Sequence, residues 1–356
     1  MNKTAIITGV GGMDGFYLTK LLLEKGYRVI GVYRRTSTST LWRLDNLPLD
    51  DLLKSGRLIL ELADITDFSS IARIITQYKP DEFYNLAAQS EVGTSFKTPL
   101  STAEITGTGA LVCLEAIRQS MPSCRFYQAS SSEMYGNSAI GNKCNAISNN
   151  GQYNIILDES SPMVPRSPYG AAKLFAHNMV KNYRDAYDMF AVGGILFNHS
   201  SPYRGEYFAT RKITSNIAKI LAGKQNNFSM GNLDAYRDEG HSEDYMLAAW
   251  KMLQQNNPKD YVIATGETHS IREFITIAFK LVGIDDWSEY ITIDPLLLRP
   301  AEIHILIGNS ELAHNELKWS PNYSFKKLVH EMIYFDCNRQ GVGHNVRHPN
   351  EIVTQY

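Results

Sequence analysis

The sequence has few cysteines and no excess of charge of either sign. Its four cysteines, Cys113, Cys124, Cys144 and Cys337, include no CxxC pair and are too few for a disulfide-stapled fold. The 35 basic side chains nearly balance the 37 acidic ones, which leaves a formal net charge of −2 and no basic stripe. We therefore expect neither a disulfide scaffold nor a partner nucleic acid.

Long hydrophobic runs are absent as well. No apolar run approaches the ~18 residues of a membrane span, and Met1-Asn2-Lys3 passes into the apolar run Thr4–Ile7 without the architecture of a signal peptide. No internal repeat is visible, and the composition is globular. We expect a soluble, cytoplasmic protein without a membrane partner, built as one large or two closely joined domains.

Short β-branched runs alternate with amphipathic helical stretches in the first part of the chain. Strands are predicted at Thr4–Ile7, Arg28–Tyr33, Leu58–Leu62, Glu82–Leu86, Arg125–Ala129 and Phe190–Leu196. Parallel neighbours need a crossover, which a helix supplies. Residues 1–198 are therefore predicted to form an α/β domain, a Rossmann-type doubly wound parallel sheet with helices on both faces.

The second part of the chain is less regular. Residues 199–340 are predicted to form mainly a smaller mixed α/β substrate-binding lobe, from which some segments return to the first domain. Helices are expected at Ile213–Ala222 and at Ile271–Leu281, the latter capped by Ser270. The stretch 137–157, rich in Asn, Ser and Gly, is interpreted as an inserted loop, and 341–356 as a polar tail.

A glycine-rich turn follows the first predicted strand. Gly9, Gly12 and Gly15 are spaced GxxGxxG, with Met13 and Asp14 between the last two and a predicted helix after them. Glycine lets a backbone approach a pyrophosphate closely, and helix N-terminal amides point at its charge. Such a turn can also simply join strand to helix, but its place at the start of an alternating domain favours a dinucleotide site.

The ends of the next strands suggest which dinucleotide is bound. Arg34, Arg35 and Ser37 follow the second strand, where NAD-selective sites usually place an acid for the ribose 2′-hydroxyl. Guanidinium groups instead grip a 2′-phosphate, so NADP is favoured, with a solvated turn as the alternative. Further contacts are expected after the third and fourth strands, at Asp64, Ile65, Leu86, Ala87, Ala88 and Ser90.

Tyr169 and Lys173 form a Tyr-x-x-x-Lys pair, which lies on one helix face. A phenol with a pKa of ~10 is a poor base at neutral pH, and we expect the ammonium and an oxidised nicotinamide to lower that pKa. Tyr323 and Lys327 share the spacing, and there a surface pair is expected. Small residues at 170–172 are expected to let the first helix pack close to the cofactor.

Ser131 and Glu133 follow the predicted strand Arg125–Ala129, at the edge of the sheet where open α/β folds bind ligands. The Ser131 hydroxyl can hydrogen-bond the substrate oxygen that Tyr169 deprotonates. A plain dehydrogenase needs no carboxylate here, whereas an enzyme that also abstracts a carbon-bound proton and expels water does. A Glu that caps the following segment is the alternative.

These residues together resemble the extended short-chain dehydrogenase/reductase superfamily and, more closely, the GDP-mannose 4,6-dehydratase family. The resemblance runs from Thr4 to Phe335 and rests on the strings Lys79–Glu82, Asn85–Ser90, Ile195–His199, Thr210–Ile213 and Arg299–Glu302. It implies that Glu133 is an acid/base and Tyr169 the base for the sugar 4-hydroxyl. Lys173 is its partner and a ligand of the nicotinamide ribose, and Ser131 stands where the family usually has Thr.

The resemblance also implies the binding residues. NADP contacts are implied at Gly9–Asp14, Arg34–Ser37, Asp64-Ile65, Leu86–Ser90, Lys173, His199 and Arg204. GDP-sugar contacts are implied at Ser90, Asn198, Lys212, Arg237, Arg299 and Glu302. Glu302 suits the donor edge of guanine, and Arg237 and Lys212 suit the two phosphates. No metal is implied. A homotetramer joined through the Arg-rich loop, which includes Arg34, Arg35 and Arg43, is expected, with a dimer as the alternative.

The implied reaction is redox-neutral. Tyr169 removes the 4-hydroxyl proton while C4 passes hydride to NADP⁺, and Glu133 then removes the acidified C5 proton. The 6-hydroxyl leaves as water and the hydride returns to C6. GDP-mannose becomes GDP-4-keto-6-deoxymannose, in deoxysugar nucleotide biosynthesis of the GDP-fucose or GDP-rhamnose type.

Several positions depart from the family pattern. Gly11 and Met13 replace Thr and Gln, Ser101 stands where a cofactor-contacting Tyr is common, and Glu91 stands where His is usual. With the long 137–157 segment, these changes concern the sugar more than the reaction. The nearest alternative is therefore a 4,6-dehydratase of another GDP-sugar, such as GDP-manno-heptose.

Other classes fit the residues less well. A nucleotide-sugar 4-epimerase or reductase needs no acid at position 133, and a silent NADP-binding protein would lack a catalytic group. A metal site at Cys337, His344 and His348 would lack the four fixed ligands that zinc prefers.

Overall fold

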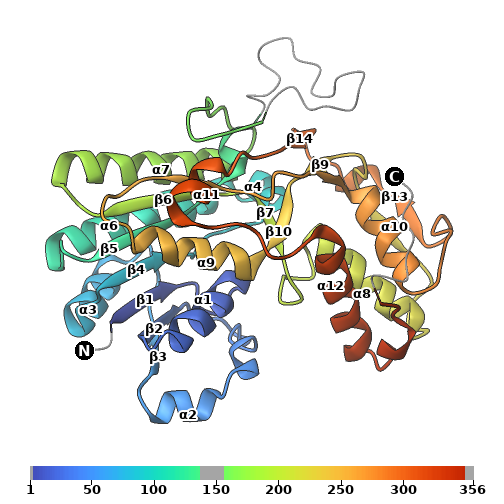
Figure 1. Cartoon of the computed structure of the whole chain (residues 1–356), viewed down its shortest axis with the longest axis horizontal. Helices are drawn as coiled ribbons and strands as arrows, with labels where there is room; N and C mark the ends of the chain where they lie inside the picture. The colour runs from blue at the N-terminus through green and yellow to red at the C-terminus, as the bar shows by residue number, and fades with distance from the viewer. Residues whose placement is uncertain (1–2, 137–155, 349–356) are drawn as a thin grey trace.

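A seven-stranded parallel sheet forms the centre of the protein, as the computed structural model shows for residues 3–136 and 156–348 (Figure 1). In sheet order the strands are β11 (Tyr261–Ile263), β6 (Ala191–Leu196), β5 (Arg125–Ser131), β4 (Glu82–Asn85), β1 (Thr4–Thr8), β2 (Arg28–Tyr33) and β3 (Leu58–Leu62). All six neighbouring pairs are parallel. The predicted doubly wound sheet is confirmed, and each predicted strand lies within two residues of its expected bounds.

Helices cover both faces of this sheet. One face carries α1 (Met13–Glu24), α9 (Ser242–Leu253) and α11 (Glu311–Leu317), and the other carries α3 (Phe68–Tyr78), α6 (Gly109–Ser120) and α7 (Pro168–Tyr187). Successive strand residues point to opposite faces. In β1, Ala5 and Ile7 therefore join the first apolar layer and Ile6 joins the second. Because both faces are buried, β1, β2 and β6 consist mainly of apolar residues and glycine.

The strand order reverses direction between β1 and β4. From β1 the chain builds outward through β2 to β3 on one side and through β4, β5 and β6 on the other. A crevice forms at the carboxyl ends of strands that flank such a switch point, and open α/β sheets bind their ligands there. The fold therefore places a ligand site above β1 and β4.

A second apolar core lies beside the sheet and belongs to the smaller lobe, at the right of Figure 1. Its helices are α8 (Ala209–Leu221), α10 (Ile271–Leu281) and α12 (Phe325–Arg339). Its short strands are β7 (Asn198–Ser200), β8 (Phe228–Met230), β9 (Tyr236–Arg237), β10 (Glu239–His241), β12 (His269–Ser270), β13 (Ile291–Ile293) and β14 (Ile305–Leu306). Ser270 caps α10 as predicted, since its hydroxyl accepts from the Glu273 amide at 3.0 Å. Although they fall within 199–340, α9, β11 and α11 lie in the layers of the main sheet.

Shorter helical turns join these elements: η1 (Leu44–Asn46), α2 (Leu49–Lys54), α4 (Val92–Lys97), α5 (Pro99–Thr102), the π-helix η2 (Ala103–Thr108), η3 (Ser132–Met134), η4 (Pro295–Leu297) and η5 (Gly343–Asn345). Of the predicted loop, residues 137–155 lie outside the described residues, and Leu157 makes a β-bridge with Gly308. Of the predicted tail, η5 is described and residues 349–356 are not. Cys113, Cys124 and Cys337 are buried free thiols, whereas Cys144 lies outside the described residues.

One continuous helix, Pro99–Ser120, is long and apolar enough to cross a membrane by length and composition alone. It has 22 residues and a mean hydropathy of 1.2 in its most apolar window, although Ser, Thr and Glu side chains interrupt its apolar residues. Half of that window is buried inside the protein, where the helix packs against α3 and α7. Its apolar residues are therefore those of a core helix.

A buried ion pair holds α8 to α12. Arg211 donates from Nε and Nη2 to the two carboxylate oxygens of Asp336, each at 2.7 Å, and the Thr214 hydroxyl donates to the same carboxylate. Arg211 Nη1 also donates to the carbonyls of Pro202 and Arg204. The pair therefore fixes the loop after β7 against two helices of the lobe.

We expect the Asp336→Ala variant to lower the free energy of unfolding by about 3–5 kcal/mol, because it leaves a buried guanidinium without its counter-charge. Urea denaturation followed by circular dichroism measures this. Asp234→Ala is the matched control, since it removes an exposed bidentate partner of Arg272 and should cost about 1 kcal/mol or less. Equal losses in the two variants would contradict the importance assigned to the buried pair.

Candidate active site

The glycine-rich loop forms a tight cradle between β1 and α1. Gly9 adopts a φ of +71°, and a Cβ there would lie 3.0 Å from the Ala87 amide nitrogen. A Cβ on Gly15 would lie 2.4 Å from the Gly9 carbonyl oxygen. Gly12 begins α1 without a side-chain cap, so the first amides of the helix keep their capacity to bind an anion. The cradle therefore fits the pyrophosphate of a dinucleotide.

Asp14, in the first turn of α1, is held by His199 and Ser242. His199 Nε2 lies 3.1 Å from both carboxylate oxygens, and the Ser242 hydroxyl donates at 2.6 Å. His199 Nδ1 lies 2.8 Å from the Phe197 carbonyl oxygen, so both ring nitrogens face acceptors and the imidazole is doubly protonated. Burial opposes both charges, but the pairing prevails: the Asp14 pKa is lowered and the His199 pKa is raised.

Arg204 adds a second cation to this side of the cradle. Its Nη1 donates to the His199 carbonyl, and its buried Nε has no hydrogen-bond partner within residues 3–136 and 156–348. Met13, half-buried, packs against the core below α1. The structure thus brings together Asp14, His199 and Arg204, which the sequence resemblance had assigned to the cofactor from positions far apart in the chain.

The Arg-rich segment after β2 lies over the glycine loop. Arg34, Arg35 and Ser37 are exposed, and the described part of the chain offers neither arginine a hydrogen bond or an ion pair. Arg43, by contrast, donates to the carbonyls of Gly11 at 2.8 Å and Tyr203 at 2.6 Å. Burial lowers the Arg43 pKa to about 10. The sequence had linked Arg43 only to assembly, and nothing in its local pattern predicted that it would clamp the cradle.

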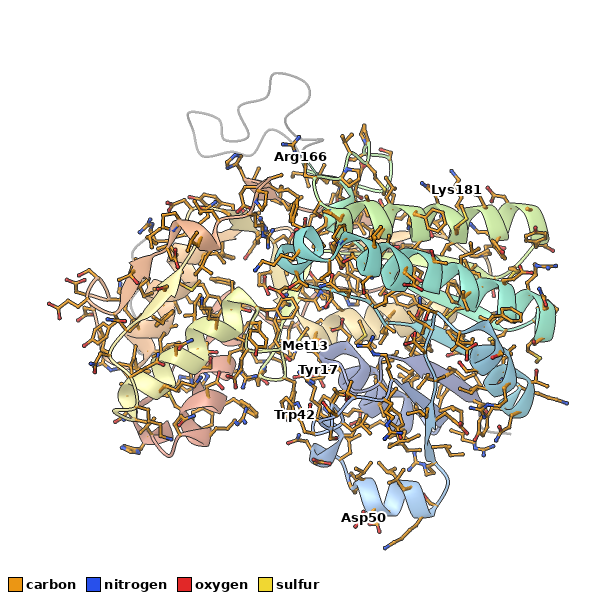
Figure 2. The ribbon with its side chains drawn as sticks, turned by 180° about the vertical axis from the view of Figure 1, so that it is seen from behind. Met13, Tyr17, Trp42, Asp50, Arg166 and Lys181 are labelled. Atoms are coloured by element: carbon orange, nitrogen blue, oxygen red, sulfur yellow. The ribbon has the colours of Figure 1, made fainter. Side chains whose placement is uncertain are left out.

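Met13, Tyr17 and Trp42 mark the place where the sheet and the lobe meet (Figure 2). The rings of Tyr17 and Trp42 both pack against Tyr203, with centroid distances of 5.8 and 6.2 Å. Aromatic contacts therefore join residues of α1, the Arg-rich segment and the loop after β7 beside the cradle.

The other predicted cofactor residues line the strand ends beside the cradle. Asp64 is half-buried, and its carboxylate accepts from the amide and hydroxyl of Thr66 at 3.0 and 2.8 Å. Ile65 is buried against Gly109, where a Cβ would come within 2.7 Å of its side chain. Ile65 therefore packs in the core, while Asp64 stays half-buried at the strand end.

The segment after β4 is held to β1. The Thr8 hydroxyl accepts from the amides of Leu86 and Ala87 at 3.1 and 3.2 Å, and it donates to Asn85. Leu86, Ala87 and Ala88 are half-buried, whereas Ser90 is exposed. Glu91, the departure beside the expected sugar pocket, accepts from the Thr94 hydroxyl at the start of α4.

Ser131, Tyr169 and Lys173 meet at the carboxyl end of β5. Tyr169 lies beside Ser131, whose hydroxyl favours the phenolate of Tyr169, and Lys173 Nζ donates to the Ala129 carbonyl at 2.6 Å. The Ser131 hydroxyl also accepts from the Glu133 amide at 3.2 Å. All four predicted catalytic side chains are buried within this one cluster.

The protonation of this cluster differs from the sequence expectation. Burial raises the Tyr169 pKa above its usual value, and the hydrogen bond from Ser131 opposes that rise only in part. Burial also lowers the Lys173 pKa, to about 8. The Lys173 ammonium bonds to Ala129 and lies 5.7 Å from the Tyr169 ring centroid, so Lys173 alone does not convert the phenol into a base.

Glycine at position 170 also serves a purpose other than the expected one. A Cβ there would lie 2.6 Å from the Glu133 carbonyl oxygen. The absence of a side chain at position 170 therefore lets α7 pack against the backbone at Glu133.

Two arginines and two glutamates form a charged group next to Tyr169. Arg299 Nη1 lies 3.5 Å from Glu133 Oε1 and 3.7 Å from Glu302 Oε1, and Arg237 Nη2 donates to Glu302 at 3.1 Å. Arg237 is buried, and burial lowers its pKa although Glu133 opposes this. The implied substrate residues thus converge on Glu133, but Arg237 and Glu302, expected to contact phosphate and guanine, pair with each other.

Of the remaining implied substrate residues, Ser90 follows β4, and Asn198 and Lys212 lie in the lobe. Asn198 opens β7, which pairs with β10 through the register Asn198↔Glu239, and its side chain is half-buried. Lys212, in the first turn of α8, is also half-buried. Burial lowers the Lys212 pKa, and Asp294 opposes this shift. Both residues lie in the lobe segments that directly follow the β6 strand end.

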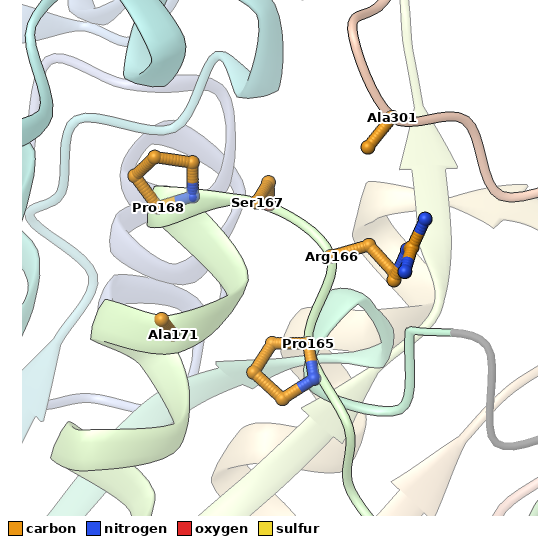
Figure 3. Close-up of a pocket in the computed structure, with 6 residues that line it drawn as sticks. All are labelled: Pro165, Arg166, Ser167, Pro168, Ala171 and Ala301. Atoms are coloured by element: carbon orange, nitrogen blue, oxygen red, sulfur yellow. The ribbon is translucent and has the colours of Figure 1, made fainter.

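An open depression of about 480 Å³ lies beside the start of α7 (Figure 3). It is lined by Pro165, Arg166, Ser167, Pro168, Ala171 and Ala301. Arg166 is exposed, and its guanidinium extends toward the loop that carries Ala301, between Arg299 and Glu302 in sequence. The sequence analysis did not assign Arg166, although its place three residues before Tyr169 was the signal that could have found it.

The other sequence candidates lie away from this cluster. Lys327 lies 3.8 Å over the Tyr323 ring, so the second Tyr-x-x-x-Lys match forms a cation–π pair between the first turn of α12 and the segment before it. Within residues 3–136 and 156–348, no three His, Cys, Asp or Glu side chains are grouped as metal ligands. His348 packs near the His330 ring, and Cys337 is buried in the lobe core.

Solved structures share this fold over nearly its whole length. The dTDP-glucose 4,6-dehydratase DesIV from Streptomyces venezuelae, solved with NAD and TYD bound, is 21% identical with a TM-score of 0.80 and covers 95% of this chain and 98% of its own. RMD from Pseudomonas aeruginosa, complexed with NADPH, is 21% identical with a TM-score of 0.73 and covers 95% and 100%. At this identity the likeness concerns the fold alone.

The sequence comparisons are more specific. A family model described as GDP-mannose 4,6 dehydratase matches residues 6–332. The GDP-mannose 4,6 dehydratase of Drosophila melanogaster is 44% identical over 354 residues, which cover 94% of this chain and 86% of that relative. With this coverage and identity, the chain belongs to the GDP-mannose 4,6-dehydratase family.

Proposed function

We propose that this protein is an NADP-dependent GDP-mannose 4,6-dehydratase that converts GDP-mannose to GDP-4-keto-6-deoxymannose and water. The observation that carries the proposal is a carboxylate, Glu133, buried beside the Ser131–Tyr169–Lys173 cluster. An epimerase or reductase has no step that needs an acid/base there, whereas a dehydratase must move a proton from carbon. Family membership supports the same reaction.

A nicotinamide cofactor is supported by the cradle around Gly9, Gly12 and Gly15. Bound there, the dinucleotide supplies the hydride chemistry, by accepting a hydride from the sugar and later returning it. The similar structures were solved with NAD in one case and NADPH in the other, so they do not select between the two. Our proposal of NADP depends on Arg34 and Arg35, two exposed guanidinium groups suited to a 2′-phosphate.

Tyr169 removes the proton of the sugar 4-hydroxyl as C4 is oxidised. Ser131, which lies beside Tyr169, holds the same substrate oxygen in place. The raised Tyr169 pKa requires positive charge near the phenol at that moment, because burial disfavours the phenolate. Lys173 lies one helical turn from Tyr169 and is held by its hydrogen bond to the Ala129 carbonyl. It supplies a cation at neutral pH because its pKa is about 8.

Glu133 carries out the second half of the reaction. The 4-ketone acidifies the C5 proton, Glu133 removes it, and the 6-hydroxyl leaves as water with the proton that Glu133 releases. The hydride then returns to C6, and C5 takes up a proton from solvent. Arg299, 3.5 Å from Glu133, orients this carboxylate. Arg237, Lys212 and Glu302 are proposed to bind the GDP part, which requires the Arg237–Glu302 pair to open toward the ligand.

GDP-mannose is proposed rather than GDP-manno-heptose because the carboxylate of Glu91 is engaged. It accepts a hydrogen bond from the Thr94 hydroxyl at the start of α4. The carboxylate that departs from the family pattern therefore has a partner in the helix that follows it and is not needed to bind the sugar. The longer segment at 137–157 remains as support for a different sugar.

We also propose a homotetramer, with a dimer as the alternative, and a cytoplasmic location. Exposed apolar side chains on the outer face of α7, Phe175 and Tyr187, support association of copies.

The three described cysteines are free thiols, which suits a reducing compartment.

Glu133→Gln is expected to abolish water loss while leaving cofactor binding near normal, because the amide keeps the size of the side chain but cannot take the C5 proton. The loss should be about 10²–10⁴-fold or more in turnover of GDP-mannose, measured by mass spectrometry of the nucleotide sugar. Glu302→Gln in the same charged group should instead raise KM. Dehydration retained by Glu133→Gln would refute the acid/base assignment.

Replacing Arg34 with Asp and Arg35 with Ser is expected to weaken NADP far more than NAD, by at least about tenfold, because two charge-assisted contacts to the 2′-phosphate are lost. Isothermal titration calorimetry of both dinucleotides measures the two dissociation constants. Arg28→Ser, an exposed arginine at the opposite end of β2, is the matched control and should change neither. An unchanged preference in the double variant would rule out the 2′-phosphate assignment.

A further inference from the structure

Helix α7 contacts the carboxyl end of β5 through every fourth residue. Tyr169 lies beside Ser131, Lys173 donates to the Ala129 carbonyl, and His177 Nδ1 lies 2.9 Å from the Ser130 hydroxyl. Residues four apart share one face of a helix. Three successive strand residues, 129–131, are therefore each tied to one turn of α7. The first two contacts belong to the catalytic cluster, and the third has no part in the chemistry described above.

The His177 ring is held in one orientation. Its Nε2 lies 3.9 Å from Asp260 Oδ2, and Asp260 is itself fixed by two hydrogen bonds from Arg184, at 3.0 and 2.7 Å, and one from the Gly193 amide at 2.6 Å. The ring therefore presents Nδ1 to the Ser130 hydroxyl and Nε2 to the side of Asp260. Burial, together with Arg184 and Lys181, lowers the His177 pKa against the opposing charge of Asp260.

Gly193 on β6 provides the space for this contact. A Cβ at position 193 would lie 2.5 Å from His177 Nδ1 and 3.2 Å from the Ser130 hydroxyl oxygen. Any side chain there would displace the imidazole from Ser130. The glycine and the histidine, on different elements, therefore fit each other around a single hydrogen bond.

We propose that His177 is a positioning residue: through its hydrogen bond with Ser130 it sets the register of α7 on β5 and so keeps Tyr169 beside Ser131. Its catalytic consequence rests on the proposed dehydratase function, whereas the contact itself does not. Small displacements of reacting groups cost turnover rather than affinity, because binding of the distant GDP part is unaffected.

The test compares His177→Leu, which fills the space without an acceptor, with His177→Asn, whose amide oxygen can accept near the Nδ1 position. We expect His177→Leu to lower kcat for GDP-mannose at least about tenfold with KM within about twofold. His177→Asn should recover most of the loss. Gly193→Ala, which pushes the ring away, should reproduce the loss, and His330→Leu on α12 is the matched control with wild-type kinetics.

Amide hydrogen exchange of the same proteins separates this inference from the proposed function. His177→Leu should speed exchange at residues 129–131 and in the first turns of α7, and His177→Asn should restore the protection. If the wild type does not convert GDP-mannose, the proposed function fails, and the exchange data still decide the contact. Wild-type kcat and wild-type exchange in His177→Leu, or equal losses in the Leu and Asn variants, would overturn the proposal.

Discussion

The chemistry of this site depends on how closely one helix approaches the end of one strand. Tyr169, Lys173 and His177 of α7 each form a polar contact with residues 129–131 of β5, and every one of these groups is buried. Buried polar groups must be partnered, so the set is stable only when the helix sits in a single register. Gly170 and Gly193 permit the approach, since a Cβ at either would meet an atom of the site within 2.6 Å.

The rest of the site is assembled around that contact by the topology of the sheet. The cradle for a dinucleotide comes from the ends of β1, β2 and β4, and the catalytic group comes from the end of β5. Parallel strands deliver all these ends to one edge. The lobe then brings Arg237, Arg299 and Glu302 to Glu133 from more than a hundred residues away. The buried pair of Arg211 and Asp336 fixes the loop that carries Arg204 against the lobe.

Much of the fold and part of the site could be predicted from local patterns. Strand–helix alternation gave the parallel sheet, and the glycine spacing and the Tyr-x-x-x-Lys pair located the cradle and catalytic helix. The three-residue strand β11 was not predicted, because so short a segment has no periodicity. Neither the direction of the Tyr169 pKa shift nor the pairing of Arg237 with Glu302 could be predicted, since burial and contacts across 65 positions are properties of the folded chain. The His177–Ser130 contact was missed for the same reason.

The most direct test of the account is mass spectrometry of GDP-mannose incubated with the NADP-loaded protein in deuterated water. The account predicts a product that has lost one water and carries solvent deuterium at C5, because C5 is reprotonated from solvent after Glu133 has removed its original proton. Conversion of GDP-manno-heptose but not GDP-mannose, or no conversion of either sugar by protein that binds NADP, would contradict it.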